Sequence, residues 1–150
     1  MALKTRIQED VKNAMRARDK ARLGVLRMVM AAIKQKEVDE RIELDETAVL
    51  AVLDKMSKQR RESLEQFEKA GREDLAAQEQ FELELLKDYL PEPLAADELS
   101  ALIEKAIADT GASSMRDMGN VMGQLRSQVQ GRADMKAVSN AVRASLSGSP

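Results

Sequence analysis

The sequence has 150 residues, a formal net charge of −2 and 33% charged residues. It contains no cysteine and no histidine, which excludes disulfides, Cys/His zinc sites, Ser-His-Asp triads and Cys-His pairs built by this chain alone. Aromatic residues are limited to Phe67, Phe81 and Tyr89, while aliphatic residues and Met supply nearly all of the apolar content. This composition favours an all-α protein over a β-sandwich or barrel.

The first two predicted helices span residues 3–17 and 20–36. In the first, apolar residues recur at steps of three and four residues and form a single stripe. In the second, apolar residues lie on more than one side, so this helix is expected in the middle of a bundle. The stretch of residues 37–44 then breaks the periodicity, which predicts an interruption between helices.

Two further helices are predicted to form an antiparallel hairpin. Asp45 is expected to cap the third helix, and Gly71 supplies the left-handed residue that commonly ends a helix. The fourth helix is predicted from about residue 74 to residue 90, and the short loop brings the two helices side by side. The four helices together predict an N-terminal helical bundle over residues 1–92, with the three aromatic side chains in its core.

The segment Leu90-Pro91-Glu92-Pro93 is the best domain boundary in the sequence, because proline ends a helix and stiffens the chain. A small C-terminal three-helix domain is predicted beyond it, over residues 93–150. Its helices are expected at about residues 97–109, 115–129 and 134–146.

Four of the seven glycines lie between residues 111 and 131. Gly111 and Gly131 follow predicted helices and are expected to end them. Gly119 and Gly123 lie four residues apart inside the sixth helix, where each costs about 0.8–1 kcal/mol relative to alanine. Their shared face allows either tight packing against the fifth or seventh helix, or close approach by a partner backbone or an RNA phosphate.

The charges are distributed unevenly along the chain. Residues 1–36 carry ten Lys and Arg against three Asp and Glu, whereas residues 37–110 carry nine against twenty-one. Either basic and acidic helices neutralise one another internally, or a basic face binds a polyanion. Near the glycines of the sixth helix lie five further basic residues: Arg116, Arg126, Arg132, Lys136 and Arg143.

Several stretches of the sequence, considered together, resemble the GatB/YqeY family. The C-terminal stretch MGNVMGQLRSQVQGRADMKAVSNAVRASL is similar to the signature of that family, and three others match it in order and spacing: RLGVLRMVMAAIK, KQRRESLEQFEKAGREDLAAQE and LLKDYLPEPLAADEL. The resemblance implies an all-helical protein with a larger N-terminal bundle and a small three-helix C-terminal domain. The family motif recurs here at Gly119, Gly123, Gly131, Arg132 and Asp134.

The resemblance also implies a connection to tRNA. The same module forms the tail of the B subunit of the tRNA-dependent glutamine amidotransferase, which converts Glu-tRNA(Gln) or Asp-tRNA(Asn) to the amide form. That tail helps to hold the tRNA, while the kinase and glutaminase sites lie elsewhere. A carbon–nitrogen ligase label for this chain would therefore come from the family and not from its own residues. No catalytic residue, metal ligand or cofactor is predicted.

Three functions remain open from the sequence. The first is a non-catalytic tRNA-binding accessory, with tRNA or amidotransferase subunits as partners. The second is a protein-interaction adaptor that docks through the Gly/Met face of the sixth helix. The third is an enzyme that uses carboxylates or lysine, or a carbon–nitrogen ligase active only within a complex. No signal peptide or membrane span is evident, so a cytoplasmic protein is expected.

Overall fold

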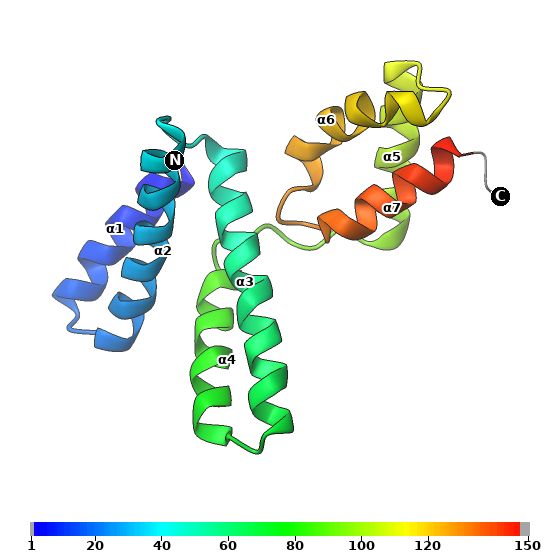
Figure 1. Cartoon of the computed structure of the whole chain (residues 1–150). Helices are drawn as coiled ribbons and strands as arrows, with labels where there is room; N and C mark the ends of the chain where they lie inside the picture. The colour runs from blue at the N-terminus through cyan, green and yellow to red at the C-terminus, as the bar shows by residue number, and fades with distance from the viewer. Residues whose placement is uncertain (1, 148–150) are drawn as a thin grey trace. The chain divides into compact units, whose positions relative to one another are not determined.

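A computed structural model describes residues 2–147 of the chain. Every regular element in this part is a helix, which confirms the predicted all-α class. The helices fall into two compact units, Met1–Leu90 and Pro91–Pro150 (Figure 1). These are called the first and the second unit below, and each has a hydrophobic core of its own.

The first unit is built from two antiparallel helix pairs (Figure 1). Its helices are α1 (Leu3–Arg16), α2 (Lys20–Glu40), α3 (Glu46–Lys69) and α4 (Glu73–Lys87). α1 packs mainly on α2, and α3 packs mainly on α4. The predicted hairpin is therefore confirmed, and Gly71 ends α3 with a φ of +70° as expected. The predicted cap is also present, because the Asp45 carboxylate accepts a hydrogen bond from the Ala48 amide at 2.8 Å.

The core of the first unit is aliphatic and lies between the helix pairs. Its fully buried side chains include Ile7, Leu26, Ile33, Leu53 and Leu86. Each such side chain contributes roughly 1.5–3 kcal/mol relative to an exposed one. Burial along α3 ends near Met56 and Ser57, so the distal half of the α3–α4 hairpin extends past this core.

The prediction that α2 ends at residue 36 is wrong, because the helix continues to Glu40. Its last turn carries charged residues, which show no apolar periodicity and so gave no helical signal in the sequence. Glu37 holds this turn in place. Its carboxylate accepts hydrogen bonds from Lys4 Nζ of α1 and from the Leu44 amide, each at 2.9 Å. Arg41, with a φ of +56°, then ends the helix.

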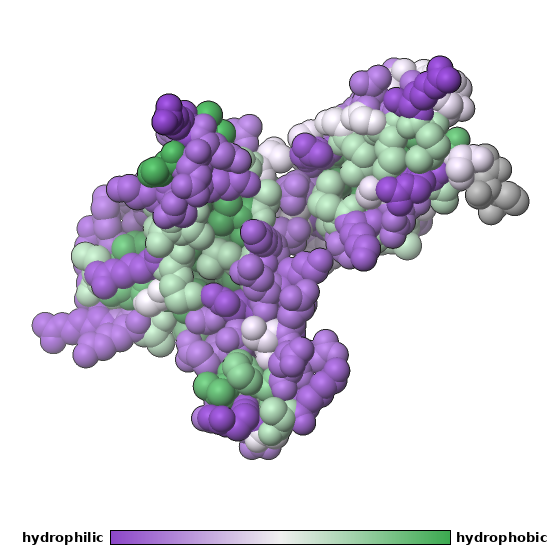
Figure 2. Space-filling view, in the orientation of Figure 1, coloured by the Kyte–Doolittle hydropathy of each residue, from purple (hydrophilic) through white to green (hydrophobic). Residues whose placement is uncertain are grey.

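The prediction that α2 lies in the middle of a bundle is also wrong. Val25, Leu26, Val29 and Ile33 face the core, but the opposite side of the helix is exposed, as Met28 (40% exposed) shows. α1, α3 and α4 cover one side of α2 within this unit and leave the second apolar side open. Green hydrophobic patches among purple polar surface are visible in Figure 2.

Tyr89 is the aromatic residue that joins the core as predicted. It is 4% exposed, its hydroxyl donates to Asp10 Oδ2 at 2.5 Å, and the Arg6 guanidinium lies 4.6 Å from the centre of its ring. Burial, with Asp10 as the acceptor, raises the pKa of Tyr89 to about 12. The prediction fails for Phe81, which is 39% exposed, and Phe67 is only half-buried. Both lie on the hairpin that extends past the core.

The second unit contains three α-helices around a separate core. They are α5 (Ala96–Thr110), α6 (Met118–Val129) and α7 (Met135–Leu146), and a short 3-10 turn, η1 (Met115–Asp117), precedes α6. The first turn of the predicted sixth helix is therefore a 3-10 turn. Its core consists of Ile103, Ala106, Val121, Leu125, Val129, Val138, Val142 and Leu146.

Polar caps and glycines define the ends of these helices. Asp117 Oδ2 accepts from the amides of Ser113 at 2.8 Å and Ser114 at 3.2 Å, and the Ser114 hydroxyl accepts from the Arg116 amide. Gly111 and Gly131 adopt φ values of +68° and +77°. In this region a side chain would strain the backbone, which explains why glycine ends both helices.

Candidate functional site

The exposed side of α6 brings together three of the predicted site residues. Gly119, Gly123 and Arg126 follow one another at steps of four and three residues, and all three are exposed. The opposite side of the helix carries Val121 and Leu125, which are fully buried. Residues separated by three and four positions share one face of a helix, so the glycines and Arg126 form a continuous outward surface. This surface is called the α6 face below.

The two glycines of the α6 face are not packed against another helix. A Cβ atom built on either Gly119 or Gly123 would meet no described atom within 4 Å outside its own turn of the helix. This excludes the interpretation that they permit tight packing against α5 or α7. What remains is a bare stretch of helical backbone that faces open space.

Because there is room for a methyl group, Gly123→Ala is expected to raise the free energy of unfolding of the second unit by about 0.8–1 kcal/mol. Gly119→Ala should stabilise less, since Gly119 lies in the first turn of α6. Urea unfolding of the full chain, followed by circular dichroism, measures both changes. A loss of stability in the Gly123→Ala protein would show that this face is packed in solution.

The cations nearest to this face are Arg126 on α6 and Arg116 on the preceding 3-10 turn. Both are exposed. Within the described residues, neither guanidinium makes a hydrogen bond or an ion pair. These two positive charges are therefore available to a ligand.

Arg132 is in a different situation, because it binds the segment that opens the second unit. Its Nε donates to the Glu92 carbonyl oxygen at 3.0 Å, and its own carbonyl accepts from the Leu94 amide at 2.8 Å. One of the first amides of α7 is also occupied, since Asp134 Oδ1 accepts from the Lys136 amide at 3.1 Å. The turn between α6 and α7, which contains Gly131, Arg132 and Asp134, is thus bonded to the segment before α5. This connection is called the Arg132 joint below.

Lys136 and Arg143 lie on the exposed side of α7, seven residues apart. Arg143 Nη1 donates to Asn140 Oδ1 at 3.2 Å, one turn earlier on the same side. The predicted site residues therefore divide into the α6 face, the α7 side and the Arg132 joint. Of these, the α6 face combines bare backbone with the unpaired Arg126, and the unpaired Arg116 lies on the preceding 3-10 turn.

The methionines of the proposed Gly/Met face do not share the surface of the glycines. Met118 and Met122 pack against the core of the second unit. Met115, in the 3-10 turn, is 42% exposed and is the remaining part of that face on the surface. An adaptor docking through this region would thus contact glycine, arginine and one methionine.

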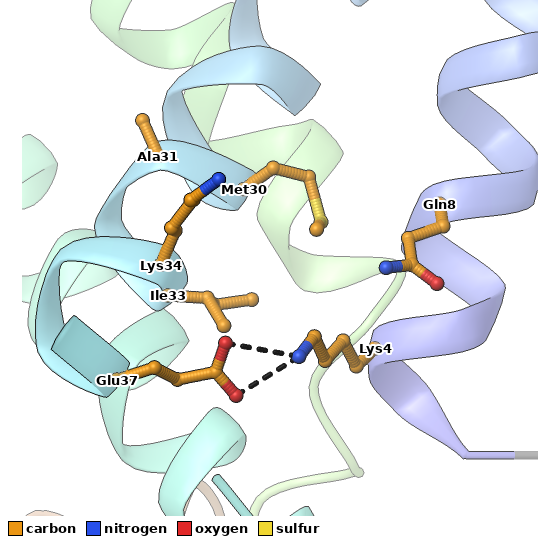
Figure 3. Close-up of a pocket in the computed structure, with 7 residues that line it drawn as sticks. All are labelled: Lys4, Gln8, Met30, Ala31, Ile33, Lys34 and Glu37. Atoms are coloured by element: carbon orange, nitrogen blue, oxygen red, sulfur yellow. Dashed lines mark hydrogen bonds and ion pairs between the residues drawn. The ribbon is translucent and has the colours of Figure 1, made fainter. Parts of the chain in front are cut away.

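The first unit has a groove that the sequence did not reveal. It lies between α1 and α2, has a volume of about 430 Å³ and includes Lys4, Gln8, Met30, Lys34 and Glu37 in its lining (Figure 3). The Lys4–Glu37 ion pair crosses it, as the dashed lines in Figure 3 show. The hydrogen bond from Lys4, followed by that from the Leu44 amide, lowers the pKa of Glu37. These charges hold α1, α2 and the start of α3 together.

Two carboxylates come together on the α3–α4 hairpin, where an enzyme hypothesis would look for acid–base chemistry. Arg60 Nε lies 2.7 Å from Glu82 Oε2 and 3.7 Å from Glu79 Oε2. Burial, with the nearby Glu82 charge, raises the pKa of Glu79. The groove of the first unit lies elsewhere, between α1 and α2. Across the described residues, no group of three or more acidic side chains is placed to hold a metal ion.

The fold and the α6 face define an all-helical module of two small units with an exposed, positively charged helix surface. The chain belongs to the Yqey-like protein family, whose model matches residues 4–146. The resemblance seen in the sequence is thereby confirmed. In the described part of the chain, no helix has the length and apolar character needed to cross a bilayer.

Curated relatives of this chain are fungal proteins named "Altered inheritance of mitochondria protein 41, mitochondrial". Those of Pyrenophora tritici-repentis and Lachancea thermotolerans are 32% and 33% identical to it, over 92% and 94% of this chain and 77% and 73% of their own lengths. That of Eremothecium gossypii is 41% identical over 63% of this chain and 54% of its own length. These names describe mitochondrial proteins and so contradict the prediction of a cytoplasmic location. That prediction is wrong.

Proposed function

We propose that this protein is a non-catalytic accessory that contacts the phosphate backbone of tRNA through the α6 face. The observation that supports this most directly is the bare backbone at Gly119 and Gly123 beside the unpaired guanidinium of Arg126. A phosphate can approach a helix more closely where side chains are missing, and an arginine one turn away can then bind it with two N–H groups. The nucleic acid is proposed to be tRNA because the resemblance to the GatB/YqeY family implies a connection to tRNA.

Contact of this kind depends on charge and shape instead of base stacking. The protein has three aromatic residues, of which Tyr89 is buried in the first unit. Proteins that stack bases use exposed aromatic platforms, and the α6 face has none among its described residues. The expected affinity is therefore modest and falls steeply with salt. The names of the relatives support a mitochondrial setting for this activity.

The test is a titration of the full chain with bulk tRNA at two salt concentrations. Replacing Arg116 and Arg126 together with alanine is expected to reduce the slope of log K against log salt by about 1.5, and to weaken binding about tenfold at 0.1 M salt. Arg132 is left in place because it holds the segment around Glu92. The melting temperature should be unchanged, since both replaced side chains are exposed and unpaired.

A matched control removes two exposed, unpaired cations from the first unit. Lys58 and Arg61 of α3 meet this description, and the Lys58→Ala/Arg61→Ala protein carries the same net charge as the test variant. It should keep wild-type tRNA affinity. Equal weakening by both variants, or salt-independent binding by the wild type, would refute tRNA contact at the α6 face.

The protein-interaction adaptor is a second candidate, which the exposed Met115 favours. Its distinguishing variant is Gly123→Leu, which fills the bare side of α6 without altering charge. An adaptor should lose its protein partner in this variant while the net charge and the fold stay as they are. Capture of a defined protein from lysate treated with ribonuclease, lost on Gly123→Leu, would favour the adaptor over the tRNA accessory.

A further inference from the structure

The outward side of α2 carries an apolar stripe that no helix of the first unit covers. Five small or apolar residues and the polar Gln35 follow one another at alternating steps of three and four residues, and all are exposed: Ala21, Gly24, Met28, Ala31, Gln35 and Val38. Alternation of three- and four-residue steps is the pattern along which one helix packs against another in a coiled coil. At about 1.5 Å per residue, the stripe is roughly 25 Å long.

The shape of the stripe suits a helix as its occupant. Ala21, Gly24 and Ala31 are small, and a Cβ built on Gly24 would meet no described atom within 4 Å. Met28, which lies between Gly24 and Ala31, is 40% exposed, and Val38, beyond Ala31, is 61% exposed. Small positions allow a second backbone to come close, and a flexible methionine adapts to the surface that it meets. The stripe thus combines small positions, where a partner backbone can come close, with apolar side chains that a partner can bury.

A row of positive charges runs along one edge of this stripe. Lys20, Arg27 and Lys34 follow one another at steps of seven residues, and all three are exposed. Lys20 and Lys34 make no hydrogen bond or ion pair within the described residues, and Arg27 contacts the Met15 sulfur at 3.8 Å. A step of seven is one heptad, and residues at this flanking position select a partner by charge.

The remaining bases of this region are not neutralised by the acidic helices. The Lys and Arg side chains of residues 1–36 form two ion pairs within the described residues, Lys4–Glu37 and Lys12–Glu9. Both lie inside α1 and α2, and neither reaches α3 or α4. The row along α2 therefore forms no ion pair with the helices of the first unit, and its charge is available to an acidic partner.

We infer that α2 binds an amphipathic helix of a partner protein, with an apolar seam on the stripe and acidic residues facing Lys20, Arg27 and Lys34. A second copy of this chain fits poorly. Antiparallel pairing of two α2 helices would place the basic row against itself. Parallel pairing would place it against Val25, Ala32 and Asp39, of which one is acidic.

The inference is tested with the full chain and two synthetic helical peptides of about three heptads each. Both carry the same leucine seam, and their flanking positions are all Glu in one peptide and all Lys in the other. The Glu peptide is expected to bind at least about tenfold more tightly, and the difference should shrink as salt is raised. Isothermal titration calorimetry measures both affinities. Ala31→Glu should abolish binding, because it places a charge in the seam of an otherwise unchanged helix.

A charge exchange separates recognition from loss of folding. The Arg27→Glu/Lys34→Glu protein should prefer the Lys peptide to the Glu peptide, which an unfolded protein cannot do. The matched Lys58→Glu/Arg61→Glu protein, with the same net charge, should keep the original preference.

Equal binding of both peptides, or binding of neither, would overturn the inference. A dimer of the wild type that Ala31→Glu dissociates would assign the stripe to a second copy, and displacement of the Glu peptide by tRNA would assign the row to nucleic acid. Either result would also overturn it. The outcome is independent of tRNA contact at α6, because none of these variants alters the second unit.

Discussion

Leu125→Ala is expected to unfold the second unit while the first unit stays folded. Leu125 is fully buried in the core of the second unit, with Val121 and Val129 one turn away on the same side of α6. Truncation of a buried leucine costs about 2–5 kcal/mol. A unit of about 60 residues with one small core rarely has more than about 3–5 kcal/mol of stability. The expected loss is therefore comparable with the whole stability of this unit.

Circular dichroism of the full chain measures this loss. The variant should lose part of its helical signal at 25 °C, and the remainder should melt at the temperature of the first unit in the wild type. Leu86→Ala is the matched control, because Leu86 is equally buried in the core of the first unit. A single transition in which both units unfold together in each variant would contradict the independence of the two cores.

Tyr89→Ala is expected to destabilise the first unit by about 3–5 kcal/mol, the usual range for removing a large core aromatic side chain. It removes the buried ring, the stacking of Arg6 above that ring and the hydrogen bond to Asp10. Tyr89→Phe separates these effects, since the ring stays and the hydroxyl is lost. Its cost at neutral pH should be about 1.5–3 kcal/mol, because one hydrogen bond to a charged group is removed.

The wild type and the Tyr89→Phe protein should also differ in how their free energy of unfolding changes at alkaline pH. The pKa of Tyr89 is about 12 in the folded protein, above the value near 10 of an unfolded chain. Its contribution to stability is therefore complete below pH 10 and is lost as the pH rises from 10 to 12. The difference in free energy of unfolding between wild type and Tyr89→Phe should shrink over this window. A constant difference up to pH 12 would show that the hydroxyl is not held by burial and Asp10.

Local signals in the sequence predicted most of the helix ends correctly. Asp45, Gly71, Gly111 and Gly131 act through bonds or φ values that lie within a few residues, so their roles follow from local sequence. The end of α2 did not follow in this way. Its last turn is held by Glu37, whose partner Lys4 lies on another helix. A contact across 33 positions leaves no local pattern.

The surfaces were harder to predict than the core. Apolar residues on two sides of α2 suggested complete burial, because periodicity does not tell whether a second face meets this chain or another molecule. The paired glycines of α6 had the same ambiguity until the space around them was known. Arg132 was included as a binding residue because the family motif recurs there, whereas its Nε donates to the Glu92 carbonyl oxygen of the same unit.

The bare side of α6 has a consequence for the evolution of this chain. A single base change converts a glycine codon into an alanine codon, so the stabilising replacement of Gly123 is always within reach of mutation. Natural proteins lie just above a threshold of stability, and a lineage selected for heat resistance alone would accept that mutation. Orthologues from hot and temperate habitats thus provide a natural experiment. If those from hot habitats keep glycine at position 123, selection favours binding at this side of α6 over thermal stability.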